Sequence, residues 1–204
     1  MIRIIAGDYR RRTLATPKGQ DVVRPLPDRV RTSIFNMLVG HLEGQPVFDA
    51  FAGVGSFGLE AASRGAQPVV MVERDREIGR LLEQNAQTVG AGERVQIVKG
   101  DALGLAALAQ CPAPVHVAFF DPPYPMMEDA AQRGRIMAQF ANVVERLDAD
   151  GFAIIRSPWP FLVRDEEGVR TQEAIDLHVP GAEGPETHVY GSTAVHWYVR
   201  AKEH

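Results

Sequence analysis

The sequence predicts an α/β protein built on one doubly wound, mostly parallel sheet. Across residues 47–155, short runs of β-branched and aromatic residues alternate with longer segments that have helical spacing. This alternation is typical of βαβ units, in which a helix connects two parallel strands. A glycine-rich turn after the first run, together with acidic residues at the ends of several runs, indicates a ligand site at the carboxyl edge of the sheet.

The composition fits a single sizeable core. The chain has 204 residues, 45% of them hydrophobic, and its one cysteine, Cys111, excludes an intramolecular disulfide and a cysteine-based metal cluster. The six histidines are scattered without the spacing of metal ligands. No apolar run approaches the roughly 18 residues of a membrane span, and charged residues come too early for a secretory signal. We therefore expect a cytoplasmic, monomeric protein that needs neither a metal nor a membrane.

Charge is distributed unevenly along the chain. Residues 1–40 carry eight basic and three acidic side chains, a net charge of +5, whereas the rest carries 14 basic and 23 acidic side chains, a net charge of −9. The overall charge of −4 argues against a protein that coats nucleic acid with its whole surface. The basic end is instead a candidate phosphate contact on an acidic domain. Its candidate arginines are Arg10, Arg11, Arg12, Arg24, Arg29 and Arg31.

A small β-hairpin arm is predicted at the N-terminus. Residues 2–5 and 9–15 are β-prone, and Ala6-Gly7-Asp8 between them is a turn signal. We assign residues 1–25 to this basic arm and residues 26–204 to the main domain.

Asp28 is the predicted N-cap of the helix that follows the arm. The apolar positions of this helix recur at helical spacing and are Val30, Ile34, Met37, Leu38 and Leu42. Arg29 and Arg31 lie in its first turn, where the helix dipole disfavours positive charge. A bound phosphate would remove the mismatch, but two solvated arginines explain the pattern equally well.

The first core strand, residues 47–51, runs into a glycine-rich turn. Gly53, Gly55 and Gly58 match the pattern G-x-G-x-x-G, in which missing Cβ atoms let the backbone approach a nucleotide-like ligand. The pattern is weak evidence when it stands alone. Asp49, four residues before Gly53, adds a carboxylate that suits a ligand with a cationic amino group.

Acidic residues also follow the next two strands. Glu73 ends the second strand, residues 69–72, at the distance from Gly53 where an acidic residue accepts from ribose hydroxyls. The alternative is a solvated helix start. Asp101 follows the third strand, residues 95–98, and its carboxylate could accept from an adenine amino group. Asp101 could equally cap a short helix, and both roles can hold together.

The fourth strand, residues 115–120, delivers Asp121-Pro122-Pro123-Tyr124 to the same edge. These residues suit attack by a planar exocyclic amine on an activated methyl group. The Asp121 carboxylate and the Pro122 carbonyl would accept the N–H hydrogens, and the prolines stiffen a loop that lacks donors. Tyr124 offers a flat face for a base, worth about 1–3 kcal/mol per stacked base. The alternative is an ordinary Asp-Pro turn.

The end of the chain is predicted to complete the sheet. A helix leads to the fifth strand, residues 152–155, and residues 173–179 and 189–199 are predicted to be the last two strands. Residues 180–188 between them are predicted to be a Gly-Pro linker. Parallel crossovers need about a dozen residues, so these last two strands should be antiparallel.

Taken together, these motifs resemble the class I S-adenosylmethionine-dependent methyltransferases. More narrowly, they resemble the bacterial (RsmD-like) family that methylates the N2 amine of a guanine in 16S ribosomal RNA. The resemblance covers nearly the whole chain and rests on residues 3–7, 24–25, 28–31, 51–58, 73–75, 121–124 and 190–193. The 121–124 tetrad is shared with adenine-N6 and glutamine-N5 methyltransferases, whereas the N-terminal motifs are more specific. The resemblance implies a Rossmann-like sheet of seven strands, the last antiparallel, with an N-terminal hairpin.

The resemblance also implies roles for the candidate residues. S-adenosyl-L-methionine is the implied cofactor, and 16S rRNA or a small-subunit assembly intermediate is the implied partner. The implied catalytic residues are Asp121, Pro122, Pro123 and Tyr124. The implied cofactor contacts are Asp49, Phe51, Gly53, Gly55, Gly58, Glu73, Arg74, Asp101, Ala102 and Asp121.

The chain departs from the family pattern at several positions, namely Leu26, Pro27, Thr32, Val54 and Arg156. Arg156 stands where an acidic residue is expected after the fifth strand. We expect none of these departures to touch the carboxylates or the tetrad, so substrate choice is what they affect.

Other functions remain open from sequence. The same chemistry could act on DNA adenine or on a protein glutamine, although the basic arm favours nucleic acid. A nicotinamide oxidoreductase would leave the 121–124 tetrad without a role. A non-catalytic RNA-binding assembly factor could retain this fold, and a purely structural acidic domain is hard to reconcile with carboxylates at three strand ends.

Overall fold

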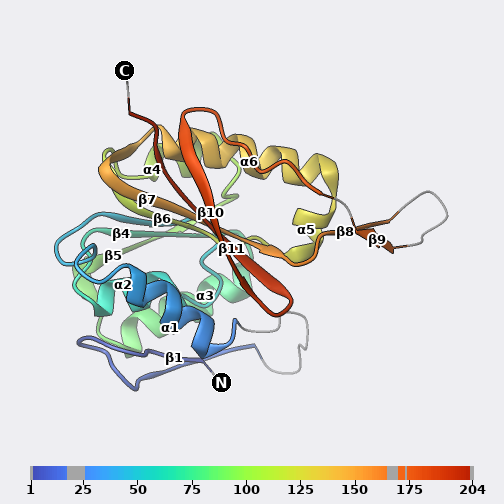
Figure 1. Cartoon of the computed structure of the whole chain (residues 1–204). Coiled ribbons are helices and arrows are strands. Elements are labelled where there is room, and N and C mark those ends of the chain that lie inside the picture. The colour runs from blue at the N-terminus through green and yellow to red at the C-terminus, as the bar shows by residue number, and fades with distance from the viewer. Residues whose placement is uncertain (1, 18–25, 165–169, 173, 203–204) are drawn as a thin grey trace.

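The computed structural model describes residues 2–17, 26–164, 170–172 and 174–202. Within these residues, seven strands form the central sheet in the order β10-β11-β7-β6-β3-β4-β5 (Figure 1). The strands are β3 (Val47–Asp49), β4 (Val69–Glu73), β5 (Val95–Lys99), β6 (Val115–Phe120), β7 (Leu147–Pro158), β10 (Ala182–Tyr190) and β11 (Thr193–Arg200). Strands β3 to β7 pair in parallel, and β11 is antiparallel to both β7 and β10. The predicted fold class is confirmed.

The sheet has one hydrophobic core on each face. Alternate residues of a strand point to opposite faces, so Val69 and Met71 join one buried cluster while Val70 and Val72 join the other. The described helices divide between these faces (Figure 1). On one face lie α1 (Asp28–Met37), α2 (Gly58–Ser63) and α3 (Arg76–Thr88), and on the other lie α4 (Leu105–Gln110), α5 (Tyr124–Glu128) and α6 (Ala130–Val144). None of these helices combines the length and apolarity that crossing a membrane requires.

The predicted positions of the sixth strand and of the linker are wrong. Residues 174–179 are not in a strand, and most of the predicted linker, residues 180–188, lies instead in β10. Pro185 is tolerated there because β10 is an edge strand and its register shifts between Glu183 and Glu186. Strands β8 (Leu162–Arg164) and β9 (Arg170–Gln172) form a separate antiparallel ribbon.

The helix after the arm begins differently from the prediction. Pro27 takes the N-cap position and Asp28 is the first helical residue, so the predicted Asp28 cap is wrong. The Asp28 carboxylate instead accepts from Arg31 at 2.9 Å. In α3 an aspartate does cap the helix: Asp75 is the N-cap, and its side chain accepts from the backbone N–H groups of Glu77 and Ile78.

The N-terminal hairpin is present as β1 (Ile2–Arg3) paired with β2 (Thr13–Leu14). It packs onto the domain, because Ile4, Tyr9 and Leu14 are buried in the core cluster that α1 and α2 share.

Candidate active site and nucleic-acid interface

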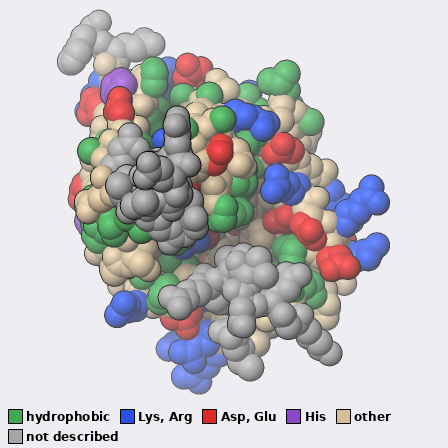
Figure 2. Space-filling view, turned by 90° about the vertical axis from the view of Figure 1, so that its right-hand side faces the viewer, with side chains coloured by type: hydrophobic (Ala, Val, Ile, Leu, Met, Phe, Trp, Pro, Cys, Tyr) green, Lys and Arg blue, Asp and Glu red, His purple; other side chains and the backbone are tan. Residues whose placement is uncertain are grey.

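Three carboxylates meet at the carboxyl edge of the sheet. Asp49 ends β3, Glu73 ends β4 and Asp121 directly follows β6. Since β3 lies between β4 and β6, the three residues end neighbouring parallel strands. The chain passes from β3 towards β4 on one side and returns to β6 on the other, which is the point where open α/β sheets bind ligands. Figure 2 faces this edge and shows a hollow bordered by hydrophobic and acidic side chains, with Lys and Arg at the margins.

Asp49 is a buried carboxylate with an unsatisfied oxygen. The residue is 0% exposed, and its Oδ2 accepts the Gly58 N–H at 2.9 Å. Its Oδ1 is buried without a hydrogen-bond partner among the described residues. Burial raises the pKa of Asp49 to about 7, the nearby backbone N–H groups of Gly58 and Phe51 oppose this shift, and the charges of Asp121 and Glu73 add to it. An orphaned buried acceptor is costly, so this site fits a ligand that brings an ammonium donor.

The three glycines of the turn have different roles. A Cβ atom on Gly55 would lie 2.7 Å from side-chain atoms of Leu59 and Leu82, and one on Gly58 would collide with Met71. Gly55 and Gly58 therefore allow close packing of the turn. Gly53 has φ +54°, and a Cβ atom there would meet nothing within 4 Å. Gly53 is thus the glycine of this turn that borders open space.

Glu73 ties this turn to the end of the second core strand. Its Oε2 accepts the Gly53 N–H at 3.0 Å, and its Oε1 accepts the Asp75 N–H at 2.7 Å. Arg74, which stands between Glu73 and Asp75 in the chain, is exposed. Phe51 is half-buried and packs edge-to-face on Phe120 at 5.8 Å.

The loop after β5 is held by a residue that the sequence did not single out. Asp101 is exposed and its Oδ1 accepts the Leu103 N–H at 3.0 Å, so it closes a turn just before α4. Ala102 is buried, and its carbonyl oxygen accepts from Gln139 Nε2 at 2.9 Å. Gln139 is 5% exposed on α6. In the sequence, Gln139 stands out as an amide among the apolar positions of that helix.

The tetrad lies between β6 and α5. Pro122 is buried and Pro123 is exposed, and Pro123 is the N-cap of α5, which starts at Tyr124. The Tyr124 hydroxyl donates to Thr193 Oγ1 at 2.6 Å, and Thr193 Oγ1 donates in turn to the Ser157 carbonyl at 3.1 Å. The Tyr124 ring is therefore anchored to β7 and β11.

Arg156 contacts both functional ends of the tetrad. Its Nε donates to Asp121 Oδ1, and its Nη1 donates to the Tyr124 hydroxyl at 3.0 Å. Its guanidinium carbon lies 4.7 Å from the centroid of the Tyr124 ring. The expectation that no departure touches the carboxylates or the tetrad is therefore wrong. Sequence reasoning missed this contact because Arg156 and Asp121 are 35 positions apart and meet only when β7 pairs with β6.

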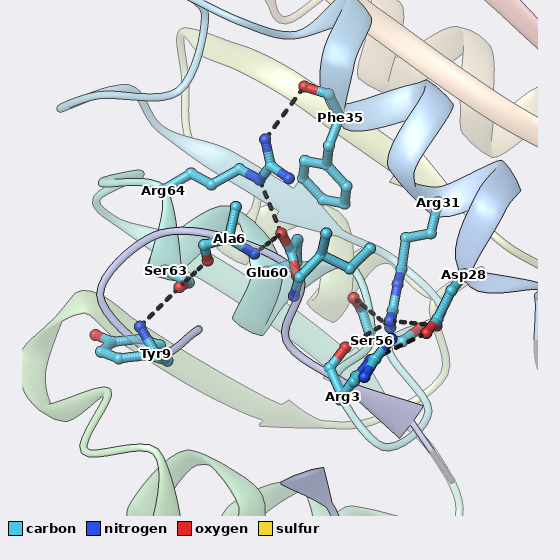
Figure 3. Close-up of polar contacts among 11 residues, drawn as sticks. Arg3, Ala6, Tyr9, Asp28, Arg31, Phe35, Ser56, Glu60, Ser63 and Arg64 are labelled. Carbon is cyan, nitrogen blue, oxygen red and sulfur yellow. Dashed lines mark hydrogen bonds and ion pairs between the residues drawn. The ribbon is translucent and has the colours of Figure 1, made fainter. Parts of the chain in front are cut away.

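The arm is fixed to α2 by buried polar groups (Figure 3). The Glu60 carboxylate, 0% exposed, accepts the backbone N–H groups of Ile5 at 2.6 Å and Ala6 at 3.1 Å. Ser63 Oγ accepts the Tyr9 N–H at 2.9 Å and donates to the Ala6 carbonyl at 2.5 Å. Helix α2 starts in the glycine-rich turn, so the arm and that turn share one support.

The candidate phosphate-binding arginines occupy different environments. Arg10, Arg11, Arg12 and Arg29 are exposed, whereas Arg24 lies outside the described residues. Arg12 donates to the Thr88 carbonyl at 3.3 Å. A pocket of about 300 Å³ separates the hairpin loop from α1, and its lining includes Arg3, Arg10, Arg11, Asp28 and Thr32.

Arg31 does not fit its predicted role at a phosphate. It is 1% exposed, and its Nη2 donates to the Arg3 carbonyl at 2.5 Å and to Asp28 Oδ1 at 2.9 Å (Figure 3). Burial lowers the pKa of Arg31, and the neighbouring Asp28 charge opposes that shift. Arg31 therefore links the arm to α1 through the hydrogen bonds of its buried side chain.

The sheet order, the glycine-rich turn and the strand-end carboxylates define a class I methyltransferase fold. The chain belongs to the family described as "Conserved hypothetical protein 95", whose family model matches residues 2–155. Within the described residues, no group of three or more His, Cys, Asp or Glu side chains is arranged to hold a metal ion.

Proteins with similar sequences carry methyltransferase names. The chain is 39% identical over 123 residues to "Ribosomal RNA small subunit methyltransferase D" of Escherichia coli K12, a match that covers 60% of each chain. It is 31% identical over 154 residues to "Putative rRNA methyltransferase YlbH" of Bacillus subtilis, covering 75% of this chain and 80% of the relative.

Solved structures share the whole fold. A putative methyltransferase, yhhF, from Escherichia coli superposes with a TM-score of 0.73 at 31% identity, covering 98% of this chain and 97% of that one. An RNA methyltransferase from Salinibacter ruber, solved with S-adenosyl-L-homocysteine, has a TM-score of 0.56 at 16% identity and covers 88% of this chain and 95% of that one. The second likeness concerns the fold alone.

Proposed function

We propose that this protein transfers a methyl group from S-adenosyl-L-methionine to the N2 amine of a guanine in 16S rRNA. The observation that carries this proposal is the tetrad Asp121-Pro122-Pro123-Tyr124 at the sheet edge, beside the buried and unpaired oxygen of Asp49. The rRNA methyltransferase names of the relatives support the substrate. Action on ribosomal RNA implies a cytoplasmic location.

The cofactor fits the residues at the edge of the sheet. S-adenosyl-L-methionine, when bound, supplies a methyl group activated by a sulfonium centre. Asp49 Oδ1 would accept from its ammonium group, and the open space beside Gly53 would admit it. Glu73 would bond the ribose, with Phe51 and Arg74 beside it. Asp101 and the Ala102 N–H would bond the adenine, held in place by Gln139.

The tetrad would hold the target amine. The lone pair of a guanine amine is delocalised into the ring, so the amine is a weak nucleophile until acceptors bind its hydrogens. The Asp121 carboxylate and the Pro122 carbonyl would do this, while the Tyr124 ring stacks on the base. The cofactor would supply its methyl group to this nitrogen, and the Asp121 carboxylate would accept the proton that the nitrogen loses. Alignment in a desolvated site would supply much of the acceleration.

RNA would approach over the arm. A guanine in paired RNA is not accessible to such a site, so the base has to be splayed out. Arg10 and Arg11 line the pocket beside α1 and form no ion pair with any residue that the structure describes. Together with Arg12 and Arg29 they would bind backbone phosphates. Arg24 stays a prediction, and so does the division into an arm of residues 1–25 and a domain of residues 26–204.

Transfer of radiolabelled methyl groups tests the proposal. The protein is incubated with labelled S-adenosyl-L-methionine and either unmodified small ribosomal subunits or the RNA extracted from them, and the nucleosides are then separated. Label in N2-methylguanosine is expected, and Asp121→Ala should abolish it. If RNA stays unlabelled, DNA and a protein mixture are offered as substrates in parallel reactions, and label in DNA adenine or in protein glutamine would replace this function by one of its chemical alternatives. Cofactor binding without any transfer would favour a non-catalytic assembly factor.

A further inference from the structure

Arg156 is a basic residue in direct contact with the tetrad. It lies on β7, one position after Ile155, which pairs with Phe120 at the end of β6. Its side chain is 10% exposed. Burial lowers the pKa of Arg156, but Asp121 and Tyr124 more than offset this, so the pKa lies above its ordinary value. A permanent positive charge is thus held beside the candidate acceptor.

This single side chain fixes two groups that the reaction would use. By binding Asp121 Oδ1, Arg156 leaves Oδ2 as the free oxygen for an incoming amine. Its guanidinium lies over one face of the Tyr124 ring at 4.7 Å, so a stacking base would have to use the other face. Thr193 holds the Tyr124 hydroxyl at 2.6 Å, so the ring is fixed at its tip as well.

The charge has a second effect on the sheet edge. The charges of Glu73 and Asp121 are close enough to Asp49 to raise its pKa. Arg156 pairs directly with Asp121, so the Asp121 carboxylate can stay in place at this acidic edge before any substrate arrives.

We propose that Arg156 is a positioning residue for methyl transfer, which sets the Asp121 carboxylate and the Tyr124 ring in the one arrangement that receives the amine and its base. The inference rests on the proposed function, since it assigns Arg156 a part in that same reaction. Lysine can supply the charge but not the planar group that stacks on Tyr124 while binding Asp121, so the two residues are not interchangeable here.

Three variants separate positioning from a purely structural role. Arg156→Ala should lower kcat on unmodified small subunits by about tenfold or more, because the acceptor loses its fixed geometry. Cofactor affinity, measured by calorimetry, should change by less than about twofold, because the partners of Arg156, Asp121 and Tyr124, are assigned to the amine and its base. Arg156→Lys should be intermediate. Arg135→Ala, at an exposed position of α6, is the matched control and should behave as wild type.

Chemical rescue is the decisive readout. Millimolar guanidinium ion should restore part of the activity of Arg156→Ala by occupying the vacated place, and it should leave Asp121→Ala inactive. Wild-type or raised kcat in Arg156→Ala would overturn the inference, since Arg156 would then merely obstruct the amine. A fall in kcat that is matched by weaker cofactor binding, and that guanidinium does not relieve, would also overturn it. If the wild-type protein methylates no RNA, the proposed function itself is refuted. If the wild type and Arg156→Ala are equally active, only the inference about Arg156 is refuted.

Discussion

The Glu60 carboxylate accepts the backbone N–H of Ile5 at 2.6 Å, and this contact joins the N-terminal hairpin to the helix that begins in the glycine-rich turn. The same carboxylate also accepts from Ala6 and from Arg64 Nε. A buried charge with three donors is well compensated. The arm therefore packs against the domain, and Glu60 is, together with Ser63, an α2 side chain that holds it there.

Glu60→Ala should loosen the arm. The substitution leaves the N–H groups of Ile5 and Ala6 and the Arg64 guanidinium without their acceptor, and each such loss costs about 1–3 kcal/mol. We expect a large drop in the free energy of unfolding, measured by urea denaturation. Glu60→Gln keeps one acceptor oxygen and should lose less. Equal stability of both variants and wild type would contradict the coupling of arm and domain.

Arg10 and Arg11 should set the salt dependence of RNA binding. The double variant Arg10→Ala/Arg11→Ala should reduce the slope of log K against log salt by about 1.5, because each lost phosphate contact removes about 0.7–0.9. The control Arg135→Ala/Lys202→Ala changes the net charge equally at exposed positions away from the arm. A slope that falls as much in the control would show a non-specific charge effect.

Arg31 should behave in the opposite way. Because its guanidinium is buried against the Arg3 carbonyl and Asp28, Arg31→Ala should destabilise the fold by about 1–3 kcal/mol and leave the salt slope unchanged. Thermal and urea unfolding give the first quantity and filter binding at several salt concentrations gives the second. A reduced salt slope together with wild-type stability would show that Arg31 contacts phosphate, as the sequence predicted.

Cofactor affinity should depend on pH through Asp49. Its pKa in the folded protein is about 7, and only the ionised form pairs with an ammonium group, so affinity should rise as pH increases through 7. Asp49→Asn should lower the affinity by about 1.5–3 kcal/mol, the usual value of a charged hydrogen bond, and should remove this pH dependence. Calorimetric titration between about pH 5.5 and 8.5 measures both effects.

The same pKa has a consequence for stability without ligand. A carboxyl with a folded pKa near 7 and an unfolded pKa near 4 binds its proton more tightly in the folded state. Stability that depends on this proton is fully present below about pH 4 and is lost as pH rises through 7. Asp49→Asn should therefore flatten the fall in stability between these values. An unchanged profile would show that Asp49 ionises normally.

Asp121→Ala should remove methyl transfer with little loss of cofactor affinity, because Asp121 is assigned to the amine. Asp121→Asn keeps an acceptor oxygen at the same place and should retain part of the activity. Single-turnover transfer and calorimetry separate the two quantities. A large rise in the cofactor dissociation constant of Asp121→Ala would contradict the assigned role.

The sequence by itself determined the parallel core of the sheet and the residues at its carboxyl edge. Strands β3 to β6 are short and apolar with glycine or acidic residues at their ends, and both signals are local, so they can be read along the chain. The edge strand β10 was not predicted, because its exposed side tolerates Glu183, Pro185 and Glu186, and these residues are typical of a linker.

Only the tertiary structure decided which charged side chains face solvent. Arg10 and Arg31 look alike in a count of basic residues, yet one lines a surface pocket and the other is buried against a backbone carbonyl. Arg156 and Asp121 are 35 positions apart and meet because β6 and β7 pair. Charge is a property of each residue, but burial and pairing depend on which strands and helices become neighbours when the chain folds.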